Sequence, residues 1–518
     1  MATIQSIKFI SAAAAAALAC TLAGNAYADD GEAFKVKRSL KGNMMEVYNV
    51  VPGTADTITE MFSKGIVYGR LRVNSFNWDW KNDDTAQTKN KDNRALGLGG
   101  NLIYKTASLY GLSVGAGLYY TDEPFPGERM SEADIGYLKA GKDTTSRYNV
   151  NRLGTYGFAT LAQAYVQYDI SKTSFVAGRQ IFESFLTKSN DTKMIPNTFE
   201  GYSFTTKELP QTRIRGAWFY QQKLRDHETF HDVLTYDDSN TSVKTHWDGN
   251  DDSAVHKGLS VNNFRAAGED ITHSLIVADI QNKSIKNLQL DLTYGGVPGV
   301  VSSLTGEINY AIPVGGWTVT PGARYMQQMD DGGGKVGGAS LKGTLVDWTG
   351  GTAVFDDTKG YATPDSLDSS LWMARLVAES GPLKMMVAYS AVADEADIVA
   401  PWRGFPTGGY TRAMAQYNWY ANTKTTAAQV NYNFDKAGLV PGLSAMVRYA
   451  MQDFDEDKQA AGVQADSNIL HIDLIEKIKA IPGMEAKVRV GLVDAKDREA
   501  GYDKDSYNEY RFELNYLF

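Results

Sequence analysis

The chain has 518 residues, 43% of them hydrophobic, with a formal net charge of −9 and a single cysteine. Its acidity argues against a nucleic-acid-binding protein, and beyond residue 28 no uninterrupted apolar run reaches the ~18 residues of a membrane-spanning helix. The 49 glycines, the 29 tyrosines and a mean hydropathy of −0.33 suit a membrane wall whose strands are apolar on one face only.

The first 28 residues have the layout of a secretory signal peptide. Lys8 precedes an apolar run over 9–22, and Ala26-Tyr27-Ala28 supplies an A-x-A cleavage site. We therefore predict a cleavable signal peptide over residues 1–28 and export of the chain. Cys20 lies inside this segment. Its use as a lipoprotein anchor is a weaker alternative, because the downstream A-x-A site fits better.

Residues 29–64 form an N-terminal segment ahead of the first predicted strand. Within 54–63, Ile58, Met61 and Phe62 have helical spacing, which predicts a short helix at the mouth of the domain that follows. That domain, residues 65–518, contains no proline-rich linker or composition break. We therefore predict that it is a single folded unit.

Alternating apolar residues dominate residues 65–518. In 95–106 the apolar side chains run from Leu96 to Tyr104 on even positions, while Asn101 and Lys105 occupy the opposite face. A turn at 109–111 leads to a second alternating segment, so the two form a hairpin. The same pattern recurs at 162–168, 288–294, 304–310, 317–325, 372–376, 383–389, 428–434, 443–449 and 486–492. Strands with one apolar and one polar face predict an all-β, transmembrane antiparallel β-barrel.

Short and long connections alternate along these segments. The short ones lie near 170–173, 281–286, 311–316, 379–382 and 478–483, and the long ones, rich in Asp and Gly, at 121–157, 329–368 and 453–467. Short periplasmic turns and long outer loops are typical of bacterial outer-membrane barrels. The alternation predicts roughly 16 to 18 strands. Between residues 183 and 270 the predicted strands do not alternate consistently between the two directions across the membrane, so at least one strand there is missed or misassigned.

The last strand has the pattern of a strand that spans a bilayer. From Tyr510 to Phe518 an aromatic or aliphatic side chain occupies every second position, and the chain ends on Phe518. A soluble edge strand seldom ends on its largest apolar residue. We therefore predict insertion into the bacterial outer membrane, in contact with its lipids and lipopolysaccharide, with Phe518 as the signal for the barrel-assembly machinery.

The polar faces of the predicted strands are rich in arginine. In 66–76, Arg70 and Arg72 alternate with apolar residues and should point into the lumen. The same assignment predicts that further basic residues face inward, namely Arg179, Arg213, Arg215, Arg324, Arg375, Arg448, Lys487, Arg489 and Arg511. Fewer acids face inward, such as Asp291, Glu307, Asp473, Glu485 and Glu513. Fixed guanidinium groups attract small anions and bind carboxylates through two hydrogen bonds. Alternatively, the arginines pair with the inward acids and stiffen the wall.

Several longer segments resemble a known family. Gly178-Arg179-Gln180, the run 194–201 and the runs 400–414 and 416–420 are similar to OprD-like outer-membrane porins, in particular the epsilonproteobacterial type. The similarity extends from about Gly65 to the end of the chain. It implies 18 strands, infolded loops that narrow the pore to an eyelet, and a ladder of basic residues. Members of this family pass small water-soluble molecules, often carboxylates such as amino acids.

The resemblance also implies roles for particular residues. Arg179, Arg375 and Arg448 become candidates for the ladder, and the loop Glu183–Tyr202 becomes the candidate constriction, with the loop around Arg403 as a second infolded element. The constriction candidates are Glu183, Lys188, Asp191, Lys193, Glu200 and Arg403. The leading hypothesis is a porin for passive diffusion of small anionic or carboxylate-bearing solutes, with no enzyme activity and no cofactor.

Other functions find weaker support in the sequence. An outer-membrane phospholipase or protease needs a Ser/His constellation, and none can be assembled on one strand face. A surface adhesin with binding loops is the main alternative. His227 and His231 have metal-ligand spacing but lie in a predicted loop, and the acidic run 248–252 lacks the spacing of a calcium loop, so no metal site is predicted. The preferred solute and the oligomeric state stay open, with a homotrimer as one candidate.

Overall fold

The computed structural model describes most of the chain beyond the predicted signal peptide. The described residues are 36–42, 44–81, 91–139, 141, 144–189, 193–234, 256–349, 351–400, 410–414, 417–496 and 506–518. The predicted signal peptide over residues 1–28, with Cys20, lies outside them. Within the described ranges, no helix is long and apolar enough to cross a membrane.

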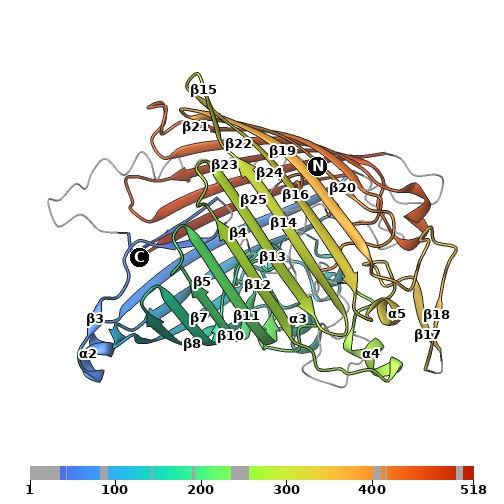
Figure 1. Ribbon diagram of the computed structural model, residues 1–518, viewed down its shortest axis with the longest axis horizontal. Coiled ribbons are helices and arrows are strands. Elements are labelled where there is room, and N and C mark those ends of the chain that lie inside the picture. The colour runs from blue at the N-terminus through green and yellow to red at the C-terminus, as the bar shows by residue number, and fades with distance from the viewer. Residues whose placement is uncertain are drawn as a thin grey trace.

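Eighteen antiparallel strands close into one barrel (Figure 1). In chain order they are β4 (Ile66–Trp80), β5 (Asn93–Lys105), β7 (Leu112–Asp122), β8 (Phe158–Ile170), β9 (Thr173–Gln180), β10 (Thr198–Thr206), β11 (Thr212–Lys223), β12 (Leu275–Asn282), β13 (Leu288–Val297), β14 (Val301–Tyr310), β16 (Trp317–Asp330), β19 (Ser369–Ser380), β20 (Leu383–Val392), β21 (Lys424–Asn433), β22 (Leu443–Asp453), β23 (Ser467–Lys477), β24 (Met484–Ala495) and β25 (Tyr507–Leu517). The first and last of them close the ring, since β4 pairs with β25. The predicted all-β fold, a single 18-stranded barrel, is confirmed.

Shorter elements accompany the barrel strands. The short strands are β1 (Arg38–Leu40), β2 (Glu46–Tyr48), β3 (Thr54–Ala55), β6 (Ser108–Leu109), β15 (Ile312–Val314), β17 (Val346–Thr349) and β18 (Thr352–Phe355). The helices are α2 (Ile58–Ser63), α3 (Arg147–Leu153), α4 (Val261–Ala267) and α5 (Gly334–Gly337), and the 3-10 turns are η2 (Pro126–Glu128), η3 (Ile135–Tyr137) and η4 (Glu456–Ala461). Helix α2 starts at Thr57, whose side chain accepts the Glu60 backbone N–H at 3.2 Å. It lies at the barrel end that carries the C-terminus (Figure 1).

The two faces of each barrel strand differ in character. In β4, Leu71 points outward and is 60% exposed, whereas its neighbours Arg70 and Arg72 point inward and are 1% and 2% exposed. Successive side chains of a strand point to opposite faces, so one face carries hydrocarbon and the other carries charge. The wall therefore has the apolar outer surface that a bilayer requires.

Aromatic side chains mark both ends of this outer surface. Near the long-loop end, the rings of Trp372 and Tyr389 lie 5.2 Å apart. Near the short-turn end, Tyr516 stacks on Phe518 with 5.8 Å between ring centroids. The carbonyl of Phe518 accepts the backbone N–H of Gly69 at 2.9 Å, so the last residue takes part in closing the barrel. Aromatic belts of this kind occupy the membrane–water interfaces of such proteins.

The connections at one end of the barrel are short and those at the other are mostly long. The turns 171–172 and 381–382 join strands at the short end, whereas 123–157, 331–368 and 454–466 emerge from the long end. The predicted alternation of turn and loop lengths is confirmed for these connections.

Strands β10 and β11 lie between residues 183 and 270, where the up-and-down order of the predicted strands was inconsistent. Their pairing register shifts between Glu200 and Gly201. A shift of this kind places an extra residue in one strand and interrupts the period of two. The alternation in the sequence could not be followed through it, and this is why the strand count stayed open.

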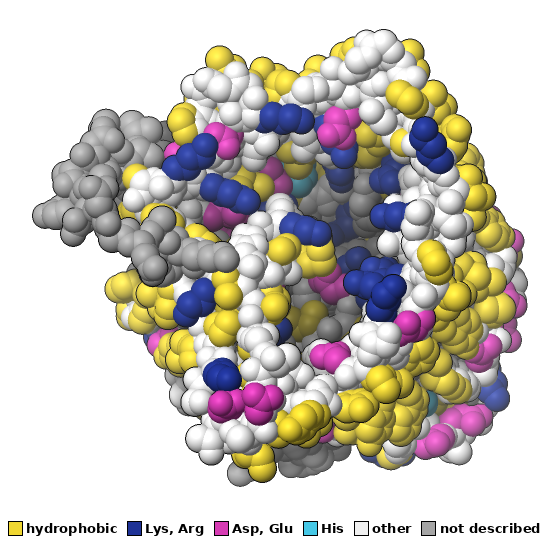
Figure 2. All heavy atoms as spheres, turned by 60° about the vertical axis from the view of Figure 1, so that its left-hand side comes forward, with side chains coloured by type: hydrophobic (Ala, Val, Ile, Leu, Met, Phe, Trp, Pro, Cys, Tyr) yellow, Lys and Arg dark blue, Asp and Glu magenta, His cyan; other side chains and the backbone are white. Residues whose placement is uncertain are grey.

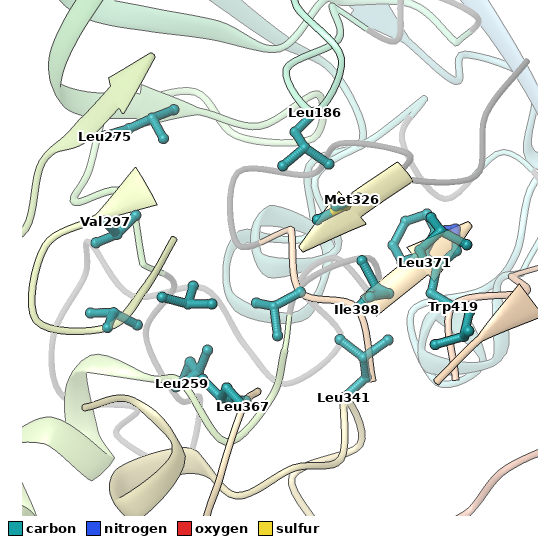
Figure 3. Close-up of a cluster of buried hydrophobic side chains, with 14 of the residues drawn as sticks. Leu186, Leu259, Leu275, Val297, Met326, Leu341, Leu367, Leu371, Ile398 and Trp419 are labelled. Atoms are coloured by element: carbon teal, nitrogen blue, oxygen red, sulfur yellow. The ribbon is translucent and has the colours of Figure 1, made fainter. Parts of the chain in front are cut away.

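Long loops fold back into the barrel and pack against its inner wall. Leu186 from the connection 181–197 and Ile398 from the connection 393–423 belong to the same buried cluster as the inward-facing Leu275, Met326 and Leu371 (Figure 3). All five side chains are at most 2% exposed. Full burial of such a side chain stabilises the fold by about 1.5–3 kcal/mol. The infolded loops are therefore firmly held parts of the lumen.

Close contact between strands predicts one sensitive glycine. Gly100 of β5 faces outward, and a Cβ atom added there would lie 1.8 Å from the carbonyl oxygen of Arg70 on β4. Gly100→Ala should destabilise the barrel by about 1–3 kcal/mol, because backbone has to move to make room. Gly306 of β14 also faces outward but has open space around it, so Gly306→Ala is the matched control. Urea unfolding, followed by heat-modifiable gel mobility, measures both variants. Equal stability of the two would contradict this account.

Candidate functional site

The interior of the barrel carries most of the predicted basic residues. Figure 2 looks toward the end with α2 and shows a hollow whose wall bears Lys and Arg side chains, together with Asp and Glu. Strand parity turns nine of the ten predicted arginines to the inner face, namely Arg70, Arg72, Arg213, Arg215, Arg324, Arg375, Arg448, Arg489 and Arg511. Most of them contact a carboxylate, and the pattern of these contacts is regular.

One carboxylate on β25 is shared by two arginines of β4. Arg72 donates to Oε1 of Glu513 through Nη2 at 2.6 Å and Nε at 3.0 Å. Arg70 Nη2 lies 3.3 Å from the same oxygen, and its Nε donates to Asn515 Oδ1 at 2.8 Å. The two strands are neighbours at the closure of the barrel, and the group is buried. It holds two positive charges against one negative charge.

The same two-to-one arrangement recurs between β11 and β12. Arg215 makes a bidentate contact with Asp279, with Nε 3.0 Å from Oδ1 and Nη2 bonded to Oδ2. Arg213, two residues earlier on the same inner face, lies 3.8 Å from Oδ1 of this carboxylate. The Arg213 side chain is 34% exposed, so its charge is accessible to the lumen.

A third carboxylate, Glu307 of β14, joins two further arginines and an infolded loop. Arg324 of β16 donates to Oε2 through Nε at 2.6 Å, and Arg375 Nη2 of β19 lies 3.3 Å from Oε1. Arg375 also donates to Asn309 Oδ1 at 2.7 Å. The hydroxyl of Tyr410 donates to Glu307 Oε1 at 2.9 Å. Tyr410 comes from the connection 393–423, so this ion-pair group fixes that loop to the wall.

Two infolded loops meet at Arg324. Its guanidinium lies 4.2 Å from the ring centroid of Phe185, in the connection 181–197, and 4.6 Å from that of Tyr410. On the far side of the barrel, Asn74 Nδ2 of β4 donates to the carbonyl of Lys193 at 2.8 Å. The connection 181–197 therefore reaches from β16 to β4 across the interior. The infolded loops expected to narrow the lumen are confirmed.

Arg448 differs from the other inward arginines. Its Nε donates to Gln429 Oε1 at 2.7 Å, and its Nη1 donates to the backbone carbonyl of Arg412. Within the described ranges, Arg448 makes no ion pair. The neighbouring Arg489 binds Asp473 through two contacts of 2.9 and 2.8 Å. Arg448 thus presents a guanidinium whose protein partners are neutral.

The last inward arginine lies on β25. Arg511 Nε donates to Oε1 of Glu509, two residues away on the same inner face, at 2.5 Å. Its guanidinium also lies 5.5 Å from the ring centroid of Phe76 on the neighbouring strand β4. This one-to-one pair adds no net charge to the wall.

The inward placement of Arg179 expected from the sequence is wrong. Arg179 shares its face of β9 with Phe175, which is 48% exposed on the outside of the barrel, whereas Gln180 is buried inside. Its Nε contacts Oε2 of Glu200 at 2.9 Å, and Glu200 is its register partner on β10. Both side chains, predicted as a ladder and a constriction residue, lie on the outer face. Apolar residues occupy both parities of β9 before Arg179, so the sequence alone did not fix the phase.

The other constriction candidates fall into three groups. Glu183 stabilises the infolded connection 181–197, because its Oε1 accepts the Ser189 backbone N–H at 3.2 Å and hydroxyl at 2.5 Å. Lys188 is half-buried in the same connection, and the ammonium of the buried Lys193 lies 4.2 Å from the ring centroid of Phe76. Asp191 and Arg403 lie outside the described residues.

Sequence reasoning missed the aromatic residues that organise the constriction. Phe185 and Tyr410 lie in loops, where no strand alternation marks them. The family resemblance did include Tyr410, within the run 400–414, but gave it no role. Its function depends on Glu307, a residue of a distant strand, and only the three-dimensional arrangement brings the two together.

The outer loops are joined to one another by a buried aspartate. Asp397 accepts the backbone N–H groups of Ala421 and Leu341 and the hydroxyl of Tyr361, each at 2.7 Å. Burial raises the pKa of Asp397 to about 6, although these hydrogen bonds act in the opposite direction. The ionised carboxylate is thus disfavoured in the packed loops relative to loops released into water, where its pKa is ordinary.

This raised pKa predicts a pH dependence of loop packing. Loop packing should be most stable near pH 4 and below, and should weaken by on the order of 3 kcal/mol as the pH rises to about 6, above which it levels off. Hydrogen exchange at the Leu341 and Ala421 amides, corrected for its intrinsic pH dependence, should therefore be slower at pH 5 than at pH 7.5. Asp397→Asn should flatten the difference. Faster exchange at the lower pH in the unmodified chain would rule this out.

Comparison with known proteins agrees with the architecture. A family model described as outer membrane porin, OprD family, matches residues 143–518. The crystal structure of Acinetobacter baumannii OccAB3 superposes with a TM-score of 0.65 at 15% identity, covering 88% of this chain and 99% of that chain. Pseudomonas aeruginosa OccK8 (OprE) gives 0.63 at 17%, and P. aeruginosa OpdK, solved with vanillate, gives 0.62 at 14%, with the same two coverages.

These identities are low enough that the solved structures establish the fold alone. No curated protein matches the sequence. The family model, however, spans well over half of the chain, including fifteen of the barrel strands, from β8 to β25, and both infolded connections. Together with the closed barrel, this shows that the chain belongs to the OprD family of outer-membrane porins, non-enzymatic channels for the passive diffusion of small solutes.

Proposed function

We propose that this porin favours small anionic solutes, carboxylates above all, such as amino acids and organic acids. The observation that carries the proposal is the repeated sharing of one carboxylate by two arginines. Glu513, Asp279 and Glu307 each face two guanidinium groups. Each of these groups therefore places two guanidinium charges beside the single carboxylate that they share.

Both explanations of the inward arginines contribute to this proposal. One arginine of each group pairs with the carboxylate and stiffens the wall, and the second adds a further positive charge to the inner face. One unit charge about 6 Å from a solute anion stabilises it by roughly 0.7 to 3 kcal/mol, for effective dielectric constants between 80 and 20. Several such groups along the lumen would raise the local concentration of anions and exclude cations.

Arg448 is the strongest candidate for direct contact with a carboxylate. Its side chain is held by the neutral acceptors of Gln429 and Arg412. A guanidinium binds a carboxylate through two parallel hydrogen bonds, and here no protein carboxylate competes at ion-pair distance within the described ranges. The vanillate in the OpdK structure is itself a carboxylate, which makes it a sensible first test solute.

Liposome swelling with three solutes of matched size tests the proposal. Vanillate, vanillyl alcohol and vanillylamine differ chiefly in charge. We expect vanillate to enter at least about threefold faster than vanillylamine, with the alcohol in between, because the surplus charge acts on entry. Faster entry of the amine would overturn the anion preference while leaving the diffusion channel intact. If no solute entered, the surface-adhesin alternative would gain support.

We further infer how the chain reaches and occupies its membrane. Residues 1–28 would be removed on export, leaving the segment 29–64 ahead of the barrel, and the terminal Phe518 would guide the barrel-assembly machinery. Contact with lipopolysaccharide, a homotrimeric assembly and an epsilonproteobacterial subtype are further expectations. Intact mass of the purified protein tests cleavage, and native mass spectrometry tests the trimer. A mass that retains residues 1–28, or a monomer throughout, would contradict these points.

A further inference from the structure

A β-hairpin from the N-terminal segment lies inside the barrel without joining its wall. Strands β1 and β2 pair only with each other, with Arg38 opposite Tyr48 and Leu40 opposite Glu46. Arg38 Nη1 contacts Glu46 Oε1 at 3.0 Å, so the hairpin carries its own buried ion pair. We call residues 36–42 and 44–50 the N-terminal hairpin.

The N-terminal hairpin contacts inward-facing side chains near the short-turn end. On β5, Asn101 Oδ1 accepts from Arg38 Nη2 at 3.0 Å. On β4, the hydroxyl of Tyr68 donates to the carbonyl of Val50 at 2.8 Å. On β24, the ammonium of Lys487 donates to the carbonyl of Gly42 at 2.7 Å.

Apolar side chains and the backbone of the N-terminal hairpin also contact two more barrel strands. Leu40 and Met44 form a buried cluster with Leu517 of β25. A Cβ atom on Gly42 would lie 3.7 Å from Ile475 of β23. The contacts therefore run over five successive strands, β23, β24, β25, β4 and β5. Short turns of such barrels face the periplasm, so the N-terminal hairpin covers one wall of the periplasmic exit.

The barrel strands that the N-terminal hairpin contacts carry buried basic side chains on their inner faces. Lys487 and Arg70 are each 1% exposed, whereas on uncovered strands the side chains of Arg213 and Arg375 are 34% and 24% exposed. The carbonyl of Gly42 is the one hydrogen-bond acceptor of the Lys487 ammonium within the described ranges. An ammonium has three N–H donors, so its burial is only partly compensated.

A buried carboxyl group on the same wall also has an oxygen without a hydrogen-bond partner in the described part of the chain. This oxygen is Oε1 of Glu485, two residues before Lys487 on the inner face of β24. Burial of an incompletely bonded charge is costly. Release of the N-terminal hairpin would return the Lys487 ammonium, which contacts Gly42, to water, and this gain offsets the contacts that release would break.

We propose that the N-terminal hairpin is a second, displaceable constriction at the periplasmic exit, separate from the eyelet formed by the infolded outer loops. In place, it narrows the exit and withdraws Lys487 from the lumen. Displaced, it widens the exit and exposes this cation on the wall. The inference concerns the width and accessibility of the exit, and it stands whether or not the channel prefers anions.

Thiol labelling tests this in the full-length protein. The only native cysteine, Cys20, lies in the predicted signal peptide, so Lys487→Cys reports on one site. A small water-soluble methanethiosulfonate should modify Lys487→Cys about tenfold faster once residues 36–50 are deleted, because the covering chain is gone. Arg213→Cys, on an uncovered strand, should react at the same rate with and without the deletion. Equal rates for Lys487→Cys in both backgrounds would overturn the proposal.

Single-channel recording supplies an independent measurement with milder variants. Arg38→Ala removes the contacts with Glu46 and Asn101 and should add a second, higher conductance level, which the deletion of 36–50 should make permanent. Lys41→Ala, at the exposed turn of the same hairpin, is the matched control and should keep the original level. A single unchanged conductance in Arg38→Ala and in the deletion variant would contradict a displaceable constriction, even if both fold normally.

Discussion

Arg448→Ala is expected to reduce carboxylate flux about three- to tenfold, the range that loss of one partly screened charge contact allows. The guanidinium of Arg448 is bonded to Gln429 and to a backbone carbonyl, with no ion pair within the described ranges, so it offers a full charge to a passing carboxylate. Arg375→Ala should act in the same direction but less strongly, because Glu307 already neutralises part of its charge. Uptake of amino acids and organic acids into proteoliposomes measures both variants.

Two control variants make this prediction specific. Arg448→Lys keeps the charge but loses the planar fork, so it should retain an intermediate flux. Arg179→Ala removes an arginine from the outer face of the same barrel, where it contacts Glu200, and should leave carboxylate flux unchanged. If Arg179→Ala lowered flux as much as Arg448→Ala, the assignment of strand faces would be wrong. If neither Arg375→Ala nor Arg448→Ala changed flux, the lumen arginines would have only a structural role.

Glu307→Gln is expected to increase the preference of the open channel for anions. Glu307 contacts Arg324 and Arg375 and also accepts the hydroxyl of Tyr410. The glutamine oxygen can still accept the Tyr410 hydroxyl, so the infolded loop should stay in place while one negative charge disappears. A net charge change of one unit close to the narrowest region should shift the anion-to-cation permeability ratio by about two- to fivefold.

The loop attached to Glu307 supplies a second readout. Glu307→Ala removes the acceptor as well as the charge, so the Tyr410 hydroxyl and the guanidinium groups of Arg324 and Arg375 all lose their contact with this carboxylate. We expect noisier conductance and a wider pore in Glu307→Ala, but steady conductance in Glu307→Gln. Glu60→Gln, on helix α2 outside the barrel, is the control for a lost carboxylate. A shift toward cation preference in Glu307→Gln would be incompatible with the charge arrangement described here.

The alternation of apolar and polar residues along the strands was enough to predict most of the fold from the sequence. The pattern of 95–106 and its repeats reflects a physical requirement, since lipid contacts one face of each strand and water the other. The same requirement explains the final strand that ends on Phe518. Where a register shift at Glu200/Gly201 interrupts the period, or where apolar residues occupy both parities before Arg179, this requirement no longer fixes the phase. The missed strand and the wrong face of Arg179 both arise there.

The arrangement of the lumen was only partly predictable. The alternation predicted that Glu307, Arg324 and Arg375 point into the lumen. It did not predict that they contact one another, because such contacts depend on the register between neighbouring strands. Tyr410 and Phe185 gave no local signal, since their positions depend on loops that pack against distant strands. The N-terminal hairpin was equally hidden. Its partners Asn101 and Lys487 lie on strands far away in the sequence, and only closure of the barrel brings them together.

The sign of the zero-current potential across a planar bilayer in a KCl gradient tests the central claim most directly. The three groups of two arginines and one carboxylate predict that chloride permeates faster than potassium, and that Glu307→Gln moves the potential further in the same direction. A potential of the opposite sign, with potassium the faster ion, would contradict a lumen with surplus positive charge.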